Sequence, residues 1–387
     1  MRRAYKFLLR PTARQAGLLG VMLTDHRTLY NAALQERRDA YRMRKVSIRY
    51  TEQSAQLKDI RRADSDGQAR WSFSSQQATL RRLNKAFDGF FRRVKAGKTP
   101  GYPRFKGAGW FDTVEWPKDG DGCGWLPDQN RVRLQGIGHV KVHVHRKVEG
   151  RVKTIAVKRE GRRWYLILSC DDVPADPLPA TGRVIGVDVG VASFLTTSDG
   201  EHFDNPRYMK TAADRLATAQ QTLSKCKRGS NRRRKARAKV AALHGKVRRQ
   251  RLDHAHKTAL ALVCAHDVIC HEKLNISNMT RSARGTLEQP GNNVAQKAGL
   301  NRSILDAGWG VFLSILTAKA ESAGREVIAV DPRNTSRTCP DCGHCSAENR
   351  VTQAEFRCQR CGLEAHADVV GATNILRAGL ARREAAA

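Results

Sequence analysis

Cys339-Pro340-Asp341-Cys342 and Cys358-Gln359-Arg360-Cys361, separated by fifteen residues, lead directly into Ala365-His366-Ala367-Asp368. Each C-x2-C turn can direct two sulfurs at one ion, so this spacing predicts a tetrahedral zinc ribbon. Four protein ligands fill the coordination sphere, and the predicted zinc is therefore structural. His344 or Cys345 could replace Cys342 as a ligand, but the favoured interpretation leaves both out. A carboxylate placed directly after such a ribbon suggests nuclease chemistry.

The balance of charges predicts a polyanionic partner. Seventy Lys and Arg residues oppose 37 Asp and Glu residues, which gives a net charge of +33 over 387 residues. Nucleic acid is the first candidate for that partner. A ribosomal protein or a membrane-surface binder would carry a similar charge, but a chain of this length with 40% apolar residues can bury two or three cores. Ordered domains are therefore expected to carry the charge.

The other six cysteines and the first residues of the chain indicate a reduced, intracellular protein. These cysteines show no paired spacing, and the chain opens with Met1-Arg2-Arg3-Ala4-Tyr5-Lys6 rather than with an apolar signal segment. No apolar run approaches the roughly 20 residues that a membrane helix needs. We expect a soluble, cytoplasmic protein without a membrane partner.

The N-terminal half changes from helical to strand periodicity. Residues 5–10 are predicted to form a strand, and Thr12 with Gln15 forms a capping-box pattern before a helix. A second helix is predicted over residues 74–95, and its aromatic stripe is expected to be core rather than a base-stacking surface. Strand periodicity over residues 132–169 predicts a small antiparallel barrel or sheet. Prolines within residues 171–181 predict a linker and the main domain boundary.

Two basic segments are candidates for contact with phosphates. The loop 97–106 interleaves basic and aromatic residues and could track phosphates through Tyr102, Arg104 and Lys106. The densest positive run, residues 225–239, begins what we predict to be one long helix and offers Lys227, Arg228, Arg232, Arg233 and Arg234. A solvated helix face is the alternative, but a block of like charge repels itself unless a phosphate backbone neutralises it.

Three acids lie at the ends of apolar elements. Asp188 lies in the apolar strand predicted at 183–190, Glu272 ends a similar strand, and Asp368 opens a predicted helix. A carboxylate inside an apolar run is costly unless it has a partner. One such acid alone could equally be satisfied by backbone donors. Three together are what divalent-metal phosphoryl chemistry requires, because hard oxygen ligands hold Mg2+.

These residues resemble a known family. Gly186-Val-Asp188-Val-Gly190, Glu272-x-Leu-Asn-Ile, Val330-Asp-Pro-Arg-Asn-Thr-Ser336 and His366-x-Asp368 are similar to the split RuvC-like nuclease of TnpB proteins. TnpB proteins are transposon-encoded, RNA-guided DNA endonucleases related to type V CRISPR effectors. The similarity extends through residues 101–106, 229–232 and 301–323, so it spans nearly the whole chain.

Two places depart from the usual family pattern. His271 and Lys273 flank Glu272, and Val370-Gly371 stands where Asn-Ala is common. Local geometry at these two acids is therefore left open by the resemblance. We expect Lys273 to point away from the metal site, because adjacent residues of a strand face opposite sides.

The resemblance implies a multidomain fold of α+β and α/β parts. An N-terminal wedge β-barrel, similar to an oligonucleotide-binding fold, would contain a helical recognition insert. An RNase H-like RuvC nuclease domain would be interrupted by the four-cysteine zinc ribbon. The implied boundaries are 1–10 and 97–178 for the wedge, 11–96 for the insert, 182–336 for RuvC motifs I and II, 337–364 for the ribbon, and 365–387 for motif III and the C-terminal tail.

The resemblance also implies the site residues and the partners. The catalytic, Mg2+-binding acids would be Asp188, Glu272 and Asp368, and the zinc ligands Cys339, Cys342, Cys358 and Cys361. Two Mg2+ ions, one Zn2+ ion and a guide RNA from the transposon end are implied. One site would cut both strands of a target DNA next to a short recognised motif. The ribonucleoprotein would contain a single copy of the protein and associate with the nucleoid of a prokaryotic cell.

The sequence leaves open the roles of three further residues and two alternative functions. Arg333 could steady the scissile phosphate or pair with Asp331. Gln76 and Gln77 could read adenine edges in the adjacent motif or simply be exposed to solvent. A nuclease-inactive, RNA-guided repressor is the main alternative function, and the three intact acids argue against it. A strand-transfer transposase also needs three acids, but a ribbon between the second and the third is not its usual plan.

Overall fold

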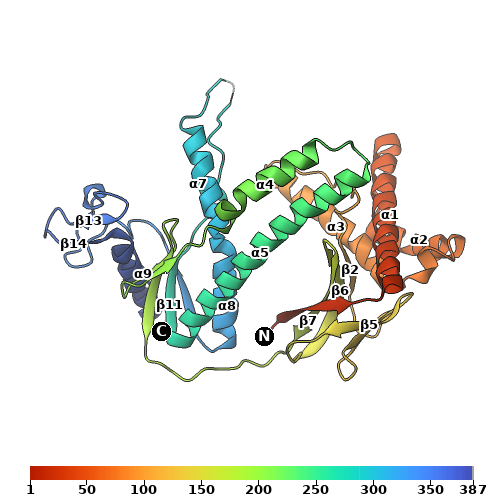
Figure 1. Ribbon diagram of the computed structural model, residues 1–387, viewed down its shortest axis with the longest axis horizontal. Helices are drawn as coiled ribbons and strands as arrows, with labels where there is room; N and C mark the ends of the chain where they lie inside the picture. Colours follow the sequence, from red (N-terminus) through yellow and green to blue (C-terminus); the bar gives the residue numbers. More distant parts are fainter. Residues whose placement is uncertain (287, 386–387) are drawn as a thin grey trace. The chain divides into compact units, whose positions relative to one another are not determined.

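The protein forms two compact units in the computed structural model, which describes residues 1–286 and 288–385 (Figure 1). The units are Met1–Pro174 and Ala175–Ala387, so the division falls within the proline-containing stretch 171–181. None of the described helices is long and apolar enough to cross a membrane.

The first unit is built on one antiparallel sheet. Strand β1 (Arg3–Arg10) lies at its centre, between β5 (Gly138–His143) and β7 (Arg163–Asp171). The other strands extend the sheet to the order β2-β6-β7-β1-β5-β4-β3, with β2 (Thr113–Trp116), β6 (Arg151–Glu160), β4 (Arg131–Leu134) and β3 (Cys123–Leu126). Within the described residues, β2 and β3 do not pair with each other. The predicted barrel is therefore an open, curled half-barrel.

Three helices and a short 3-10 turn are inserted between β1 and β2. Helix α1 (Ala13–Arg44) begins with the predicted capping box, in which the Thr12 and Gln15 side chains each accept the other residue's backbone N–H. Helix α3 (Phe73–Lys95) confirms the second predicted helix. The sequence pattern does not predict α2 (Tyr50–Ala63) or η1 (Gln68–Arg70).

The aromatic stripe of α3 lies only partly in the core. Leu80 and Leu83 are buried, whereas Phe91 is 55% exposed and Phe90 is half-buried. The loop after the helix supplies one ring over this end, because Tyr102 packs edge to face on Phe90 with centroids 5.3 Å apart. The prediction that the whole stripe is core is therefore wrong for the last turns of the helix.

The second unit is built on a mixed sheet of the order β10-β9-β8-β11-β12. Strand β8 (Val184–Asp188) pairs antiparallel with β9 (Ser193–Thr197), which confirms the predicted hairpin. On its other side β8 pairs parallel with β11 (Val268–Glu272), the strand predicted to end in an acid. The edges are β12 (Glu326–Val330), parallel to β11, and β10 (His202–Asp204), antiparallel to β9.

Helices cover both faces of this second sheet (Figure 1). Helices α5 (Asn231–Ala265) and α8 (Trp309–Ser322) pack on the face that carries Ile185 and Val187. Helix α9 (Ala367–Glu384) packs on the opposite face, where Ile375 joins the core. Helix α4 (Tyr208–Ser224) forms an antiparallel hairpin with α5, and the other helices are α6 (Ile276–Met279) and α7 (Val294–Ala307).

A small subdomain, the ribbon, separates β12 from α9. It contains η2 (Ala347–Asn349) and the hairpin of β13 (Glu355–Arg357) and β14 (Glu364–His366). Its core joins Cys339, Phe356 and Cys358 to Ala367 and Val370 in the first turns of α9. Helix α9 therefore belongs to two cores, one in the ribbon and one on the sheet.

Candidate functional site

Two of the predicted acids end neighbouring parallel strands. Val187 on β8 is in register with His271 on β11, so Asp188 and Glu272 follow side by side. Side chains alternate along a strand, and the two acids therefore lie on the α9 face rather than on the face of Val187. The carboxyl ends of parallel strands are also where open sheets of this kind place their ligands.

Helix α9 carries the third acid in its first turn. His366 caps the helix, and its Nδ1 accepts the backbone N–H of Asp368 at 3.3 Å. Two glycines allow the helix to lie close to the sheet. A Cβ on Gly186 would lie 2.1 Å from a backbone oxygen of α9, and one on Gly379 would lie 2.2 Å from the Cys270 sulfur. This close packing brings the first turn of α9 to the ends of β8 and β11.

The raised pKa of Asp188 indicates that negative charge is crowded at this site. Burial, followed by the carboxylates of Glu272 and Asp368, raises the pKa of Asp188 to about 7. Burial also raises the pKa of Glu272. The guanidinium of Arg350 lowers the pKa of both groups, but it does not cancel the rise. Buried like charges of this kind are stabilised by a bound cation, so the residues present fit a divalent-metal site.

Three polar residues that sequence reasoning missed hold the acids in place. The Thr335 hydroxyl donates to Glu272 Oε1 at 2.6 Å, and Arg350 Nη2 lies 3.5 Å from Asp368 Oδ1. Asn374 on α9 donates to the Thr335 carbonyl at 2.8 Å, which ties the segment after β12 to the helix. Thr335 lies within a segment that carries the family resemblance, but nothing in the sequence pattern gives it a role. Arg350 is one basic residue among many in the sequence.

The four cysteines of the ribbon meet as predicted. Their sulfur atoms all lie within 4.8 Å of one another. Cys339 Sγ is 3.6 Å from Cys361 Sγ, and Cys342 Sγ is 3.5 Å from Cys358 Sγ. Sulfurs held at about 2.3 Å from a tetrahedral zinc ion would lie about 3.8 Å apart. The cluster therefore suggests a zinc site, and neither His344 nor Cys345 belongs to it.

The two C-x2-C turns share one backbone geometry. The N–H of the first cysteine, Cys339 or Cys358, donates to the carbonyl five residues further on, at 2.9 Å in both turns. The glycine after the second cysteine, Gly343 or Gly362, donates back to the first at 3.1 and 3.0 Å. Both glycines have left-handed φ angles, 73° and 76°, which other residues rarely adopt. Each half of the cluster is therefore a local turn, and the buried Asn349 joins the two halves by donating to the His344 carbonyl and accepting the Gln359 backbone N–H.

The acids are spaced more widely than the cysteines. Among residues 1–286 and 288–385, the four cysteines are the one set of three or more His, Cys, Asp or Glu side chains whose ligand atoms all lie within 4.8 Å. The carboxylates of Asp188, Glu272 and Asp368 are near enough to shift a pKa, but they do not form such a closed cluster. An open arrangement leaves room for a substrate or for solvent beside a bound ion.

The predicted basic segment forms the tip of the α4–α5 hairpin and the first turns of α5. Lys227, Arg228, Arg232 and Arg234 are exposed. No ion pair joins these four side chains to an acid in the described part of the chain. Arg233 instead donates to the carbonyls of Leu223 and Cys226, at 3.0 and 3.1 Å, and so closes the end of α4. Arg233 thus has a structural partner, whereas the other four are available to a polyanion.

Gln76 is not placed to read a base. It is 0% exposed, its amide donates to Gln68, and its oxygen accepts from Arg61 at 2.7 Å. The proposed base contact and the solvent-exposed alternative are both wrong for Gln76, because the unpredicted α2 and η1 enclose it. Gln77 is partly exposed and donates to Ser54 at 3.0 Å.

The remaining candidates differ in their availability. The Arg333 side chain is 86% exposed and pairs with Asp331 at 2.7 Å, which is the alternative left open by the sequence. Arg104 and Tyr102 are exposed. Lys106 lies over the Tyr30 ring, 5.7 Å from its centroid, which fixes this end of the loop to α1.

Three family descriptions match different parts of the chain. Residues 151–283 match the OrfB_IS605 family, described as "Probable transposase". Residues 309–375, which include the ribbon, match the "Cas12f1-like, TNB domain". Residues 1–45 match a "Helix-turn-helix domain" of OrfB_IS605 proteins, although here they form strand β1 and the single long helix α1.

Several relatives match nearly the full chain. "Putative RNA-guided DNA endonuclease InsQ" from Escherichia coli (strain K12) is 35% identical, covering 97% of this chain and 92% of its own length. A "Putative RNA-guided DNA endonuclease" from Streptomyces pristinaespiralis is 30% identical, with 98% and 90% covered. "CRISPR-associated endodeoxyribonuclease Cas12f1" from Sulfoacidibacillus thermotolerans is 26% identical over 55% of this chain and 50% of its own length.

The fold and the site therefore define a class of protein: mixed α+β, with a half-barrel, a mixed sheet and a four-cysteine ribbon. The similarity to relatives over almost their full length narrows this class to one family. The chain belongs to the TnpB (OrfB_IS605) family, which is related to Cas12f.

Proposed function

We propose that this protein is an RNA-guided DNA endonuclease of an IS605-type element, with Asp188, Glu272 and Asp368 as its catalytic acids. The observation that carries the proposal is the meeting of three acids from β8, β11 and α9, where their mutual repulsion contributes to raising the pKa of Asp188 to about 7. The two relatives named as RNA-guided DNA endonucleases, which match over at least 90% of their own lengths, support the same activity.

The three carboxylates would hold two Mg2+ ions. When bound, such ions activate a water molecule and stabilise the leaving oxygen of a phosphodiester. Thr335 orients Glu272 by donating to one oxygen, which leaves the other free for a ligand. Arg350 lies beside Asp368 and could also face a phosphate, because a guanidinium suits a planar pair of oxygens. Asp188 is half-buried, so protein atoms cover part of its carboxylate.

Different parts of the fold would have different roles in recognition and cutting. The half-barrel would be the wedge and the α1–α3 insert the recognition domain, while the second sheet with α9 would be the RuvC-like nuclease interrupted by its zinc ribbon. The guide RNA would pair with one DNA strand and so supply sequence specificity. Gln77 stays a candidate for reading the adjacent motif, and the exposed cations of the α4–α5 hairpin stay candidates for phosphate contact. One site would cut both strands in turn.

A guided repressor and a strand-transfer transposase remain the alternatives, and the description "Probable transposase" matches part of the chain. Retention of all three acids favours cutting over repression. A transposase would join the cut ends to a second DNA, whereas an endonuclease would leave them free.

The direct test uses the full chain purified with RNA from its own flanking DNA, presented with a plasmid library that contains a guide-matched target. Mg2+-dependent cutting that requires the matched target and disappears in Asp188→Ala is the expected result. Asp214→Ala, an exposed acid on α4, is the control and should cut normally. Guided binding without cutting would instead establish a repressor, and joined strands would establish a transposase.

A further inference from the structure

A histidine on the edge strand of the second sheet lies in the same row as one of the proposed catalytic acids. Asp188 on β8 is the register partner of Thr196 on β9, and Thr196 is the partner of His202 on β10. Directly opposite residues of neighbouring strands point to the same face of a sheet, so all three side chains lie on the α9 face. The row therefore runs from Asp188 to the edge of the sheet.

Hydrogen bonds to strand β9 orient the ring of His202. The hydroxyl oxygen of the buried Thr196 lies 3.0 Å from His202 Nδ1. The hydroxyl oxygen of Ser193 lies 3.5 Å from the same nitrogen. His202 itself is exposed, so these contacts, rather than burial, set the direction in which its ring points.

The ring of His202 packs on the residue that caps helix α9. The rings of His202 and His366 meet edge to face, with centroids 4.7 Å apart and planes at 73°. This is one of the arrangements that aromatic rings prefer. Because His366 Nδ1 accepts the backbone N–H of Asp368, a contact that fixes His366 also restrains the backbone of the third acid. The row that carries Asp188 is thereby linked to Asp368.

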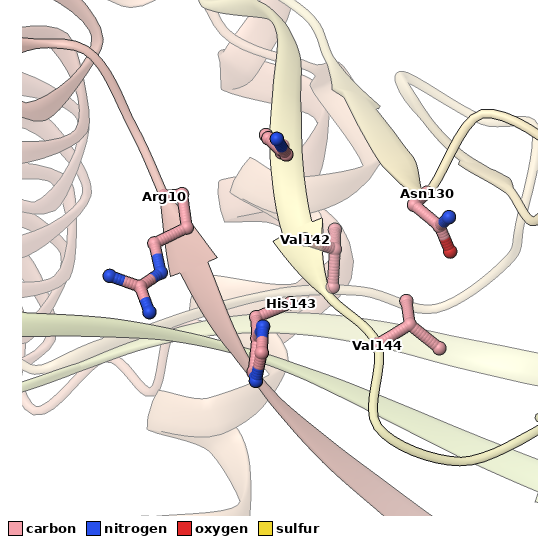
Figure 2. Close-up of a pocket in the computed structure, with 6 residues that line it drawn as sticks. Arg10, Asn130, Val142, His143 and Val144 are labelled. Carbon is pink, nitrogen blue, oxygen red and sulfur yellow. The ribbon is translucent and has the colours of Figure 1, made fainter.

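Another pair of histidine rings, in the first unit, is built differently. His143 and His145 lie at the end of β5, with ring centroids 6.4 Å apart and planes at 33°. Residues two apart in an extended segment lie on the same side of the chain, so local geometry alone brings these rings together. His143 lines an open pocket of about 570 Å³ beside Arg10 (Figure 2). The contact between His202 and His366 instead joins elements distant in the sequence, so tertiary packing must specify it.

We propose that His202 is a positioning residue for Asp368, which it fixes relative to Asp188 through the capping residue His366. This inference rests on the proposed function, because that function requires the acids to hold metal ions together. Arg350 contacts the carboxylate of Asp368, whereas the histidine pair acts on its backbone. The spacing of the acids matters because a misplacement of about 1 Å can cost about a hundredfold in rate.

Three substitutions of His202 separate its ring from its hydrogen bond. His202→Ala removes both. His202→Asn keeps an oxygen that can accept from the Thr196 hydroxyl but has no ring to pack on His366, and His202→Phe keeps a ring without the hydrogen bond. His244→Ala, which removes an exposed imidazole from α5, is the control.

Two properties of each full-length variant are measured. Single-turnover cleavage of a guide-matched target is followed with the copurifying RNA over a range of Mg2+ concentrations. Binding of Mn2+, which prefers the same oxygen ligands as Mg2+, is measured on the protein without nucleic acid by electron paramagnetic resonance. Thermal melting of each free protein reports folding.

His202→Ala and His202→Asn should bind Mn2+ about tenfold more weakly and cleave about tenfold more slowly at low Mg2+, since residues that orient metal ligands contribute at least this much. The loss of cleavage should shrink as Mg2+ rises. His202→Phe and the control should match the wild-type protein. In a His366→Asn background, which keeps a capping oxygen but no ring, His202→Ala should have little further effect.

Two results would overturn the proposal. One is normal Mn2+ binding and cleavage by His202→Ala. The other is a lower melting temperature of His202→Ala with a loss of cleavage that is equal at all Mg2+ concentrations and is not restored by His202→Phe, because His202 would then only stabilise the fold.

Failure of this proposal and failure of the endonuclease assignment give different results. If the wild-type protein cuts guide-matched plasmid while His202→Ala binds Mn2+ and cuts normally, the positioning role is wrong and the proposed function stands. If the wild-type protein never cuts but His202→Ala binds Mn2+ more weakly than the wild-type protein does, the positioning role stands and the nuclease does not.

Discussion

The ribbon and the acid site both have side chains suited to binding a metal ion, but they are built in opposite ways. Each half of the cysteine cluster is a local turn, and the sulfurs of the two halves already lie 3.5 and 3.6 Å apart. The acids come from three elements distant in the sequence, and their crowded charges help raise the pKa of Asp188 to about 7. One arrangement is closed and locally specified, and the other is open and depends on tertiary packing.

This difference separates a site that stabilises a fold from one suited to catalysis. A closed four-ligand sphere leaves no position for a substrate, whereas loosely spaced carboxylates keep ligand positions free. The open site has an electrostatic cost, because buried like charges oppose one another when no cation is present. The ribbon should therefore respond to mutation mainly through folding, and the acid site mainly through activity.

Loss of one zinc ligand should have the largest effect. Cys358→Ser removes a thiolate from the cluster and loosens the core shared with Ala367 and Val370, which precede and follow Asp368. Structural zinc binding is worth about 10–16 kcal/mol, so the variant should purify with little zinc, melt lower and cut no DNA. Metal analysis and thermal melting measure this.

The matched control is Cys345→Ser, because Cys345 is exposed and lies outside the cluster. It should keep one zinc per chain. A full zinc content in Cys358→Ser would remove the assignment of this ligand.

Replacing a strand acid should separate activity from stability. Asp188→Asn should reduce cleavage on the order of a thousandfold or more, because a carboxylate that we propose as a ligand of the catalytic metal is gone. The folded pKa of Asp188 is raised from 3.8 to about 7, so the unfolded chain loses this proton first as pH rises. The metal-free wild-type protein should therefore lose stability between about pH 4 and pH 7, on the order of a few kcal/mol.

Asp188→Asn should lack this loss and melt higher than the wild-type protein at pH 8 without metal. Melting curves across pH, with and without Mg2+, measure both effects, and Asp214→Asn serves as the exposed control. If the variant were less stable than the wild-type protein at pH 8, the claim of charge crowding would be wrong.

Removal of the hydroxyl that orients Glu272 should have an intermediate effect. Thr335→Val keeps the shape of this buried side chain but deletes its 2.6 Å hydrogen bond to the acid. Residues that orient metal ligands typically contribute 10–100-fold, and a loss of that size in cleavage, with a weaker response to Mg2+, is expected. Thr335→Ser keeps the hydroxyl and should therefore cleave DNA like the wild-type protein. Thr317→Val, on the exposed side of α8, should leave cleavage unchanged. Normal cleavage by Thr335→Val would show that Glu272 needs no such support.

The smallest effect should come from a methyl group beside Asp188. A Cβ on Gly371 would lie 3.2 Å from Asp188 Oδ2, so Gly371→Ala should displace the acid by a few tenths of an ångström. We expect a severalfold loss of cleavage, with stability unchanged or improved because alanine favours helix by about 1 kcal/mol. Single-turnover cleavage and melting measure the two outcomes. A large loss of stability would mean that the helix, rather than the acid, had to move.

The sequence predicts those parts of the site that have a local signature. Apolar runs that end in an acid locate β8 and β11, and the cysteine spacing locates the ribbon, because each pattern is complete within a few residues. The partners of the acids could not be found in this way. Arg350 reaches Asp368 only because the ribbon folds back on α9.

The fold departs from prediction where packing decides between alternatives. Strand periodicity indicates an antiparallel sheet, but whether its edges close is a matter of strand tilt and length, and here β2 and β3 stay apart. The environment of Gln76 is likewise decided by packing. A glutamine at the start of a helix is expected to be exposed, but here the neighbouring α2 and η1 bury Gln76, which hydrogen-bonds to Arg61 and Gln68.

The two glycines at the contact between α9 and the sheet, Gly186 on β8 and Gly379 on the helix, have a consequence for protein design. Grafting the three acids onto another sheet and helix would copy their chemistry but not their spacing, because ordinary side chains at positions 186 and 379 would hold the helix away from the strands. A transplant of this site must therefore carry two residues that have no side chain and touch no substrate.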